Sequence, residues 1–282
     1  LVRLQFRGLP EEERKAWFFE KVYDSKGKKY DMPVLIGALG ASPQVYAIGL
    51  QCRVQEIGQR WANAQANPIP PVLVKDGPVH EVVYSGKNLM ARGGLEEFPI
   101  PVSTPGWDVA PYMTSPYWVT KDPESGIRNV GTYRAQIKAP DRAGVYVAKY
   151  FRGIAYHWRK CRNLGKPLEA AVIIGAPPNV GYTSVSQLPT DVDEYNVAGG
   201  IAGEPVELVK CKTVDLEVPA HSEIVVEGEI STEEVELEAP FGEATGYVGQ
   251  RETGLIFNVK CITHRQAPIW QSFISQFPPS ES

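Results

Sequence analysis

From residue 127 onward the chain is a succession of strand-forming segments, and this pattern constrains its fold more than any other feature. β-Branched residues dominate some segments, and polar and apolar residues alternate in others, as in half-buried strands. The predicted strand regions are 127–140, 142–151, 169–176, 205–220, 222–240 and 254–275. Two helices are predicted among them, at 153–164 and 192–202. Many strands of uneven length with few helices favour a barrel or an open, split barrel.

The first hundred residues alternate between predicted helices and strands. Acidic residues after Pro10, followed by an apolar face, predict a helix. The predicted elements are helices at 10–22, 42–50 and 54–67, a strand at 32–39, and a hairpin at 70–86 around Asp76-Gly77. The Pro-rich segment 96–108 reads as a boundary. We therefore predict an α+β protein with an N-terminal α/β domain at 1–105 and a split β-barrel domain at 106–282.

The composition narrows the classes of function. The 282 residues carry a net charge of −4, which argues against a non-specific nucleic-acid binder, because such proteins are usually basic. The sequence has no apolar run long enough to span a membrane and no signal peptide. Its four cysteines form no CxxC pair, and we interpret them as buried reduced thiols of a cytoplasmic protein. Because the chain starts at Leu1 without Met, we interpret it as a fragment or as the ordered part of a longer chain.

Two carboxylates, Glu238 and Glu243, flank an Ala-Pro-Phe-Gly turn and are candidates for acid–base chemistry. Pro240 fixes one backbone angle, and Gly242 permits a sharp turn. Near an arginine, one carboxylate would stay ionised by pairing, while a desolvated one would have a raised pKa and could deliver a proton. The alternative is that two acids meet on a surface loop by chance.

Arg134 is the candidate partner for these acids. A guanidinium binds a substrate carboxylate through two hydrogen bonds, and with a proton donor beside it this suggests decarboxylation or its reverse. Arg134 lies five residues after Asn129 on one predicted strand, which places the two on opposite faces unless a bulge or Gly131 alters the strand. The alternative is a surface arginine.

His157 and Glu204 are candidate metal ligands together with Asn129. An amide, an imidazole and a carboxylate suit manganese or magnesium, although the three span 75 residues (129 to 204) without a local motif. A packed histidine and a solvated helix face are the alternatives. The segment 175–189 is rich in Gly, Pro, Ser and Thr and could cradle a phosphate, or could be an ordinary strand-to-helix loop.

Taken together, these segments resemble the UbiD family of reversible aromatic and α,β-unsaturated acid decarboxylases. The resemblance runs through segments at 122–136, 157–160, 198–211, 218–230 and 238–247. The last of these carries the pattern E-x-P-F-G-E before Gly-Tyr, downstream of N-x-x-x-x-R. It covers most of the chain from about residue 30 onward.

The resemblance implies a prenylated FMN held by a split β-barrel through a divalent metal at the flavin phosphate, usually Mn²⁺ with K⁺ beside it. The implied metal ligands are Asn129, His157 and Glu204. The implied catalytic network is Arg134, Glu238 and Glu243, and Arg134 also contacts the cofactor. The hydroxyl-rich loop at 183–186 implies cofactor contacts from Ser184 and Ser186.

The implied reaction is reversible non-oxidative decarboxylation of an aromatic, heteroaromatic or α,β-unsaturated acid through a covalent adduct with the flavin. Arg134 would orient the substrate carboxylate, and Glu243 would exchange the proton. The resemblance also implies release or uptake of CO₂, a flavin prenyltransferase as cofactor supplier, and a homo-oligomer built from dimers. It implies no nucleic-acid or membrane partner.

Two other readings remain open at this point. Family members are longer at both ends, and their C-terminal part closes over the site. The chain is therefore alternatively a non-catalytic flavin-binding core or a structural subunit of a multi-subunit carboxylase. An ordinary FMN oxidoreductase on a similar split barrel is a third reading, although hydride transfer would not call for an arginine between two glutamates.

Overall fold

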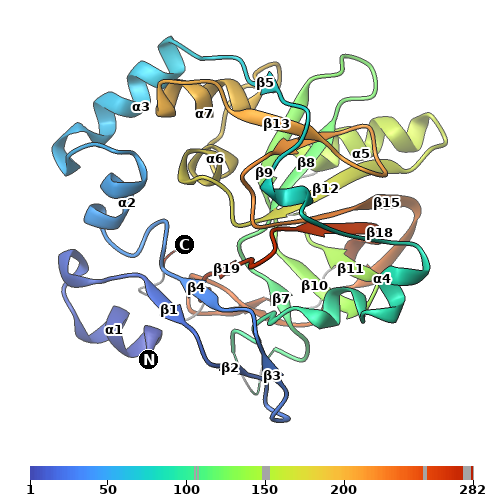
Figure 1. The fold of residues 1–282 in the computed structure, drawn as a ribbon, viewed down its shortest axis with the longest axis horizontal. Coiled ribbons are helices and arrows are strands. Elements are labelled where there is room, and N and C mark those ends of the chain that lie inside the picture. Colours follow the sequence, from blue (N-terminus) through green and yellow to red (C-terminus); the bar gives the residue numbers. More distant parts are fainter. Residues whose placement is uncertain (105, 107, 148–152, 250–252, 276–280, 282) are drawn as a thin grey trace.

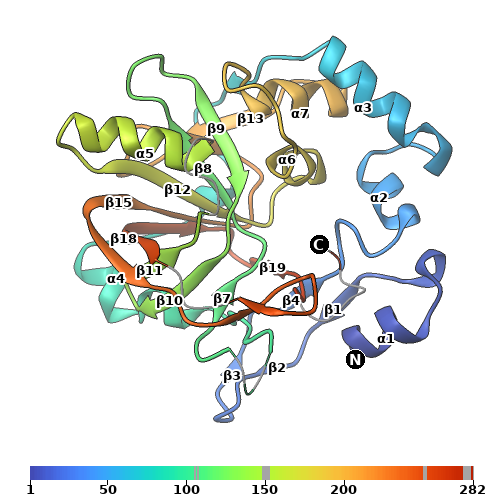
Figure 2. The ribbon, with the colours of Figure 1, turned by 180° about the vertical axis from the view of Figure 1, so that it is seen from behind.

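The computed structural model describes residues 1–104, 106, 108–147, 153–249, 253–275 and 281 (Figures 1 and 2). Its largest feature, within these residues, is an antiparallel nine-stranded sheet with the order β7-β10-β11-β18-β15-β12-β8-β9, in which β6 also pairs with β18. The strands are β6 Val82–Ser85, β7 Tyr112–Met113, β8 Tyr117–Lys121, β9 Arg128–Thr132, β10 Ala135–Ala139, β11 Arg142–Val145, β12 Leu168–Ile174, β15 Ile224–Leu237 and β18 Thr253–His264.

β15 and β18 form the long central ribbon of this sheet. Their register shifts twice, after Glu227 and between Ile230 and Val235. At the first shift a Cβ on Gly228 would lie 2.1 Å from the Asn258 carbonyl oxygen, so the close approach of the strands requires glycine. Such bulges bend and twist a strand. The ribbon ends at Leu237 and so delivers the next residues to the cavity described below.

The sheet has a hydrophobic core on each face because successive side chains of a strand point to opposite sides. On β12, Val172 and Ile174 belong to the core that contains Trp118, whereas Ile173 belongs to the core that contains Tyr195. Helix α5, Gly153–Asn163, packs into the first core. Helices α6, Pro178–Ser184, and α7, Glu194–Ala202, pack into the second. Each fully buried Val or Ile side chain stabilises the fold by about 1.5–3 kcal/mol.

Smaller sheets connect the N-terminal region to the rest. β4, Val34–Ile36, pairs with β1, Trp17–Phe19, and in parallel with β19, Trp270–Ser272. β13, Glu207–Lys210, pairs with β14, Glu217–Pro219, and in parallel with β5, Val72–Leu73. The remaining elements are α1 Val2–Gly8, β2 Val22–Tyr23, β3 Lys29–Tyr30, α2 Pro43–Gly49, α3 Ile57–Ala66, α4 Lys87–Ala91, β16 Phe241–Gly242, β17 Val248–Gly249, and 3-10 turns at Glu11–Glu13, Val54–Glu56, Pro78–His80 and Gly94–Glu97.

Two predictions for the N-terminal region are wrong. Residues 10–22 do not form a helix: a 3-10 turn at Glu11–Glu13 leads into β1, because Trp17–Phe19 find a strand partner in β4. Residues 70–86 do not form a hairpin, because β5 pairs with β13 and β6 pairs with β18. In both cases the pairing with another strand overrides the local pattern, and for β5 and β6 the partner strand is distant in sequence.

The other predicted elements are largely confirmed. Helices occur within 42–50, 54–67, 153–164 and 192–202, and β10 pairs with β11 as predicted. The end of the predicted strand at 142–151 lies outside the described residues from 148 on. The predicted loop at 175–189 contains a short helix, α6, which begins with Pro178 at a position where proline is well tolerated.

The architecture is a mixed α/β fold with large sheets. Strands from before and after residue 105 pair in three places, β4 with β19, β5 with β13 and β6 with β18. The division at residue 105 therefore stays a prediction about folding units. None of the helices in the described ranges is both long enough and apolar enough to span a bilayer.

All four cysteines are free thiols. Cys161 and Cys261 are buried, as predicted, and Cys52 and Cys211 are partly buried. Desolvation raises the pKa of Cys261 to about 12 and raises the pKa values of Cys161 and Cys211 as well.

Candidate functional site

A cavity of about 1010 Å³ lies between β9, α5, α6 and the hairpin formed by β16 and β17. Figure 2 shows β9 and α6 side by side on one edge of the large sheet. Six of the eight residues predicted from the sequence line this cavity. They are Asn129, Arg134, His157, Ser184, Ser186 and Glu243. Residues predicted from separate segments therefore converge on one space.

Arg134 joins the two glutamates that flank the Pro-Phe-Gly turn. Its Nε and Nη2 atoms donate to Oε1 and Oε2 of Glu238 at 2.8 and 2.6 Å, and Nη1 donates to Oε1 of Glu243. Burial alone would lower the pKa of Arg134, but the hydrogen bonds and charge of Glu238, followed by those of Glu243, raise it. The side chain of Glu238 is 2% exposed and that of Glu243 is 37% exposed. The two acids thus have different environments while sharing one cation.

Two aromatic rings pack against the guanidinium of Arg134. Its Cζ atom lies 4.2 Å from the ring centroid of Tyr146 and 4.8 Å from that of Phe241. Both distances fall within the range of cation–π attraction. Phe241 belongs to the turn that separates the two glutamates, so the turn supplies part of the arginine's binding site as well as its carboxylates.

The turn is held by hydrogen bonds between two side chains and the backbone N–H and carbonyl groups of Gly242. The Gly242 N–H donates to Oδ1 of Asp108 at 3.2 Å, and the Ser275 hydroxyl donates to the Gly242 carbonyl at 2.7 Å. The N–H of Glu243 donates to the Tyr247 carbonyl at 2.8 Å. Burial raises the pKa of Asp108, which accepts backbone N–H groups at this position. These contacts fix the position of Glu243 in the cavity wall.

Asn129 and Arg134 do not lie on opposite faces of one strand, as a regular strand would require. β9 ends at Thr132 and β10 begins at Ala135, so the chain leaves the sheet between them. The indole N–H of Trp118 donates to the Tyr133 carbonyl at 2.8 Å and anchors this link. Both side chains consequently line the same cavity.

Glu194 is a candidate site residue that sequence reasoning missed. It lies in the first turn of α7, lines the cavity, and accepts a hydrogen bond from the Val130 N–H at 2.8 Å. Desolvation raises the pKa of Glu194 to about 7. Its neighbour Asn129 has a buried Nδ2 atom without a hydrogen-bond partner within the described part of the chain. An acid in the first turn of a helix is usually a dipole partner, which is why the sequence did not single it out.

His157 lies on α5 and lines the same cavity. Its Nδ1 atom is 2.9 Å from the Thr120 hydroxyl oxygen, and desolvation lowers its pKa to about 4. The imidazole is therefore neutral near pH 7, which is the form that binds metals. A hydrogen bond at one ring nitrogen orients the other, as in many metal sites.

Ser184 and Ser186 form the hydroxyl-bearing wall on α6 and just beyond it. The Ser184 hydroxyl lies 2.8 Å from that of Thr132 on β9, and it also donates to the Gly181 carbonyl at 2.7 Å. The Ser186 hydroxyl donates to the Tyr182 carbonyl at 3.1 Å. Both hydroxyl oxygens keep acceptor capacity, but their protons are engaged with the helix backbone.

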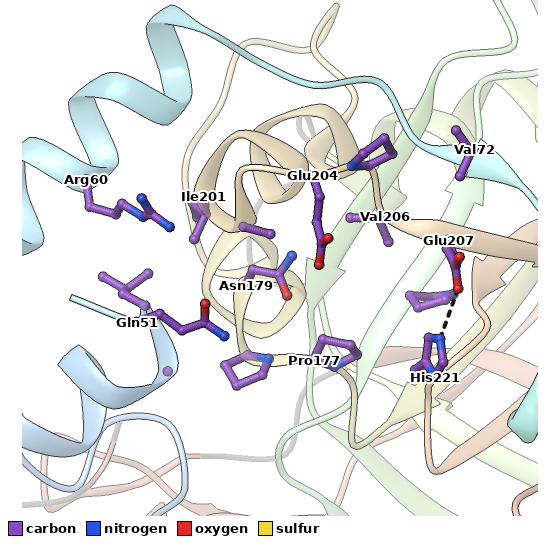
Figure 3. A pocket seen from close by; sticks show the side chains of 16 residues that line it. Gln51, Arg60, Val72, Pro177, Asn179, Ile201, Glu204, Val206, Glu207 and His221 are labelled. Carbon is purple, nitrogen blue, oxygen red and sulfur yellow. Dashed lines mark hydrogen bonds and ion pairs between the residues drawn. The ribbon is translucent and has the colours of Figure 1, made fainter.

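Glu204 is not brought to this cavity. It lines a second cavity of about 460 Å³, together with Arg60, Asn179, Glu207 and His221 (Figure 3). The predicted ligand set of Asn129, His157 and Glu204 is thus divided between two sites. Across the described ranges, no three His, Cys, Asp or Glu side chains form a metal-binding group.

Comparison with known proteins places this geometry in a family. Residues 72–278 match the UbiD family model, described as the 3-octaprenyl-4-hydroxybenzoate carboxy-lyase Rift-related domain. The chain belongs to the UbiD family. An uncharacterized protein of Aquifex aeolicus is 36% identical over 276 residues, which cover 90% of this chain and 55% of that protein. One of Archaeoglobus fulgidus is 33% identical over 279 residues, covering 95% and 56%.

Solved structures of UbiD-class enzymes have the same fold. An evolved dimeric form of HmfF from Pelotomaculum thermopropionicum, in complex with prFMN, has a TM-score of 0.85 at 35% identity and covers 94% of this chain and 59% of that one. Vanillic acid decarboxylase of Sedimentibacter hydroxybenzoicus, in closed form, has a TM-score of 0.88 at 30% identity and covers 99% and 59%. The chain spans little more than half the length of these relatives.

The UbiD match includes the six predicted residues that line the first cavity and also Glu204, Glu207 and His221 in the second cavity. It begins at residue 72 and so leaves out Gln51, which follows α2, and Arg60 on α3, both of which line that second cavity. The UbiD domain and the preceding segment therefore both contribute walls to it.

Proposed function

We propose that the chain catalyses reversible, non-oxidative decarboxylation of an aromatic, heteroaromatic or α,β-unsaturated carboxylic acid. The observation that carries the proposal is Arg134 held between Glu238 and Glu243 at the wall of a large cavity. A bidentate ion pair with a nearly buried carboxylate keeps the guanidinium fixed, and a second acid of greater exposure stands beside it. The enzymatic class of its structural relatives supports the same reaction.

Each member of this network has a separate proposed role. Glu238, paired through both oxygens, stays ionised and holds Arg134 in place. The Nη1 atom of Arg134, which contacts Glu243, exchanges that contact for the substrate carboxylate. Glu243, freed from this ion pair, takes up one proton from solvent and so becomes the proton donor. When the bond to the carboxyl carbon breaks and CO₂ leaves, the electron pair stays on the substrate carbon, and the Glu243 proton is transferred to it. Carboxylation runs the same steps in reverse.

The cofactor proposed for this cavity is prenylated FMN, with Mn²⁺ and K⁺ at the flavin phosphate. The nine-stranded sheet is proposed to be the split barrel that holds it. When bound, the modified flavin supplies an electron sink for the pair left by CO₂. Asn129, His157 and Glu194 offer an amide oxygen, a neutral imidazole and a carboxylate, a donor set that fits a divalent metal. Among the described side chains, no cation pairs with the Glu194 carboxylate. Glu194 replaces Glu204 in this proposal because it shares the cavity. Ser184 and Ser186 provide hydroxyl contacts.

The chain is proposed to depend on a flavin prenyltransferase and to act as a homo-oligomer in the cytoplasm.

The first test of the cofactor is mass spectrometry of the flavin released from protein co-expressed with a flavin prenyltransferase, with metal analysis of the same sample. We expect the mass of prenylated FMN and near-stoichiometric manganese. If neither prenylated FMN nor manganese is found, in this chain and also in a longer version of it, the proposal is ruled out.

Glu243→Gln tests the proton transfer itself. Glutamine keeps the size of the side chain and can still accept a hydrogen bond from Arg134, so we expect flavin content to be unchanged. Turnover of an aromatic acid should fall by about a hundredfold or more, the contribution typical of a general acid. Full turnover in this variant would remove Glu243 from the mechanism. Flavin binding without turnover in the unmodified protein would instead favour the non-catalytic core.

A further inference from the structure

The second cavity takes no part in the proposed reaction, yet it has the features of a binding site. Its walls come from the ends of α2 and α7, from α3, from the start of α6, and from β13 (Figure 3). At about 460 Å³ it is large enough for a small molecule. Val72, Ile201 and Val206 give it an apolar lining between the polar groups.

Opposite charges stand on different sides of this cavity. Arg60 projects from α3, and in the part of the chain that the structure describes its Nε atom is buried without a hydrogen-bond partner and its guanidinium forms no ion pair. Glu204 follows α7 and is exposed, and none of the described residues pairs with its carboxylate. In Figure 3 the guanidinium and the Glu204 carboxylate come from different walls, with Asn179 between them.

The remaining carboxylate of the cavity is already engaged. The Nε2 atom of His221 lies 3.0 Å from Oε2 of Glu207, and Figure 3 draws this contact on the side of the cavity away from Arg60. The Asn179 Nδ2 atom donates to the Ala198 carbonyl at 2.9 Å, which leaves its Oδ1 atom as an acceptor. A ligand therefore meets an unpaired cation at one end and an unpaired anion with an amide oxygen at the other.

Gln51 provides a second, independent sign of a site. Its φ is +53°, and it is the non-glycine residue with positive φ among the described positions. Glycine or asparagine is favoured directly after a helix in this conformation, whereas a long side chain is strained there. The strained backbone places the Gln51 carboxamide in the cavity wall on the side of Arg60 (Figure 3). Strained residues that persist in a fold gather at binding sites.

We propose that this cavity binds a small zwitterion of the amino-acid class, with its carboxylate at Arg60 and Gln51 and its ammonium group at Glu204. A guanidinium recognises a carboxylate through paired hydrogen bonds, and the amide N–H of Gln51 adds a donor. The carboxylate of Glu204 and the carbonyl oxygen of Asn179 accept from the ammonium group. The proposal is independent of the reaction assigned to the larger cavity.

The test is calorimetric titration of the flavin-free chain with γ-aminobutyrate, and separately with glycine and ε-aminocaproate to vary the distance between the two charges. Butyrate and butylammonium carry one charge each and serve as matched half-ligands. We expect at least one zwitterion to bind at least tenfold more tightly than both half-ligands. If none of the zwitterions binds, or if butyrate binds as tightly as the best of them, the proposal is overturned.

Two variants assign the ends of the ligand. Arg60→Met should weaken binding of the best zwitterion about tenfold or more and abolish that of butyrate, and Glu204→Gln should do the same for the zwitterion and butylammonium. Arg159→Met and Glu233→Gln are matched controls, because both residues are exposed and line neither cavity. Equal binding in all four variants would contradict the proposed orientation and the site.

Gln51→Gly separates binding from folding. Glycine relieves the positive-φ strain, so the thermal midpoint should stay level or rise, while loss of the carboxamide should weaken zwitterion binding severalfold. Weaker binding in a protein that is no less stable cannot be assigned to unfolding. Unchanged affinity in this variant would remove Gln51 from the site.

Discussion

Arg134 neutralises a carboxylate that has almost no access to water. Glu238 is 2% exposed and accepts hydrogen bonds from the guanidinium through both oxygens, so Arg134 is a main source of charge compensation for it. Removing one member of a buried ion pair leaves an uncompensated charge, which is far more costly than losing an exposed pair. The proposed catalytic network is therefore also part of what stabilises the fold.

We predict that Arg134→Met lowers the free energy of unfolding by about 3–5 kcal/mol. Arg142→Met is the matched control, because Arg142 pairs with the more exposed Glu234 and Glu236. Its cost should be about 1 kcal/mol or less. Urea denaturation of both variants measures the difference, and similar costs would show that Glu238 is solvated in the folded protein.

Glu194 and Glu204 can be told apart by metal content. Glu194→Gln should lower bound manganese severalfold, because glutamine is a poorer ligand than a carboxylate, although its side chain can still accept the bond from the Val130 N–H. Glu204→Gln should leave manganese unchanged, because Glu204 lines the other cavity. Metal analysis of the two purified variants decides between them, and the opposite result would restore the ligand set predicted from the sequence.

At the scale of elements, the start of α5 is held against β9 by a glycine. Gly153 has a φ of +49°, and a Cβ there would lie 2.1 Å from the Tyr133 hydroxyl and 2.9 Å from Oδ1 of Asn129. Helix and strand can approach this closely only without a side chain. The approach brings Asn129 on β9 and His157 on α5 to one cavity.

We predict that Gly153→Ala destabilises the protein by about 2 kcal/mol more than Gly165→Ala. Both glycines have positive φ, so both variants share the backbone strain of about 1 kcal/mol. Gly165 has no atom within 4 Å of its added Cβ, so it lacks the steric clash. Thermal unfolding compares the two variants, and equal destabilisation would mean that the Tyr133 ring moves aside freely.

The sequence predicted those elements whose pattern is local and failed where pairing with another strand decides the structure. The helices at α3, α5 and α7 follow from their periodicity, and the strand β12 follows from its apolar run. Residues 17–19 looked helical, since nothing nearby in the sequence reveals that β4 and β19 complete a sheet with them. Local periodicity specifies neither the pairing of β1 with β4, 15 to 19 residues along the chain, nor the pairing of β4 with β19.

The site was predictable to the extent that residue type identifies chemistry. Arg134, Glu238 and Glu243 meet as expected because charges of opposite sign, once buried, must pair. In the sequence Glu204 lies between small residues, whereas Glu194 lies in the predicted helix 192–202 with no local signal of a ligand. Only the packing of α7 against β9, which aims Glu194 at the Val130 N–H, distinguishes the two.

At the scale of the whole molecule, the N-terminal region shares sheets with the rest of the chain. β19, near residue 270, completes the sheet of β1 and β4. The carboxylate of Glu281 also accepts hydrogen bonds from the N–H groups of Gly37, Leu39 and Gly40 at 2.9, 3.1 and 3.2 Å. Contacts of this kind couple the stability of distant segments.

We predict that the chain unfolds in one cooperative transition despite the Pro-rich segment at 96–108. Urea curves followed by tryptophan fluorescence and by circular dichroism should coincide, because Trp17 lies before that segment and Trp118, Trp158 and Trp270 lie after it. Two separated transitions would instead support independent folding of 1–105 and 106–282.

The desolvation of three of the cysteines should make the four thiols react unequally with thiol reagents. A thiol with a pKa of about 12, such as that of Cys261, is thiolate in only about one molecule in ten thousand at pH 8, and the raised pKa values of Cys161 and Cys211 act in the same direction. Cys52 is partly buried and directly follows Gln51 in the chain. A thiol-reactive fluorophore would therefore attach preferentially to Cys52, beside the second cavity. The labelled protein would report ligand binding there without an introduced cysteine.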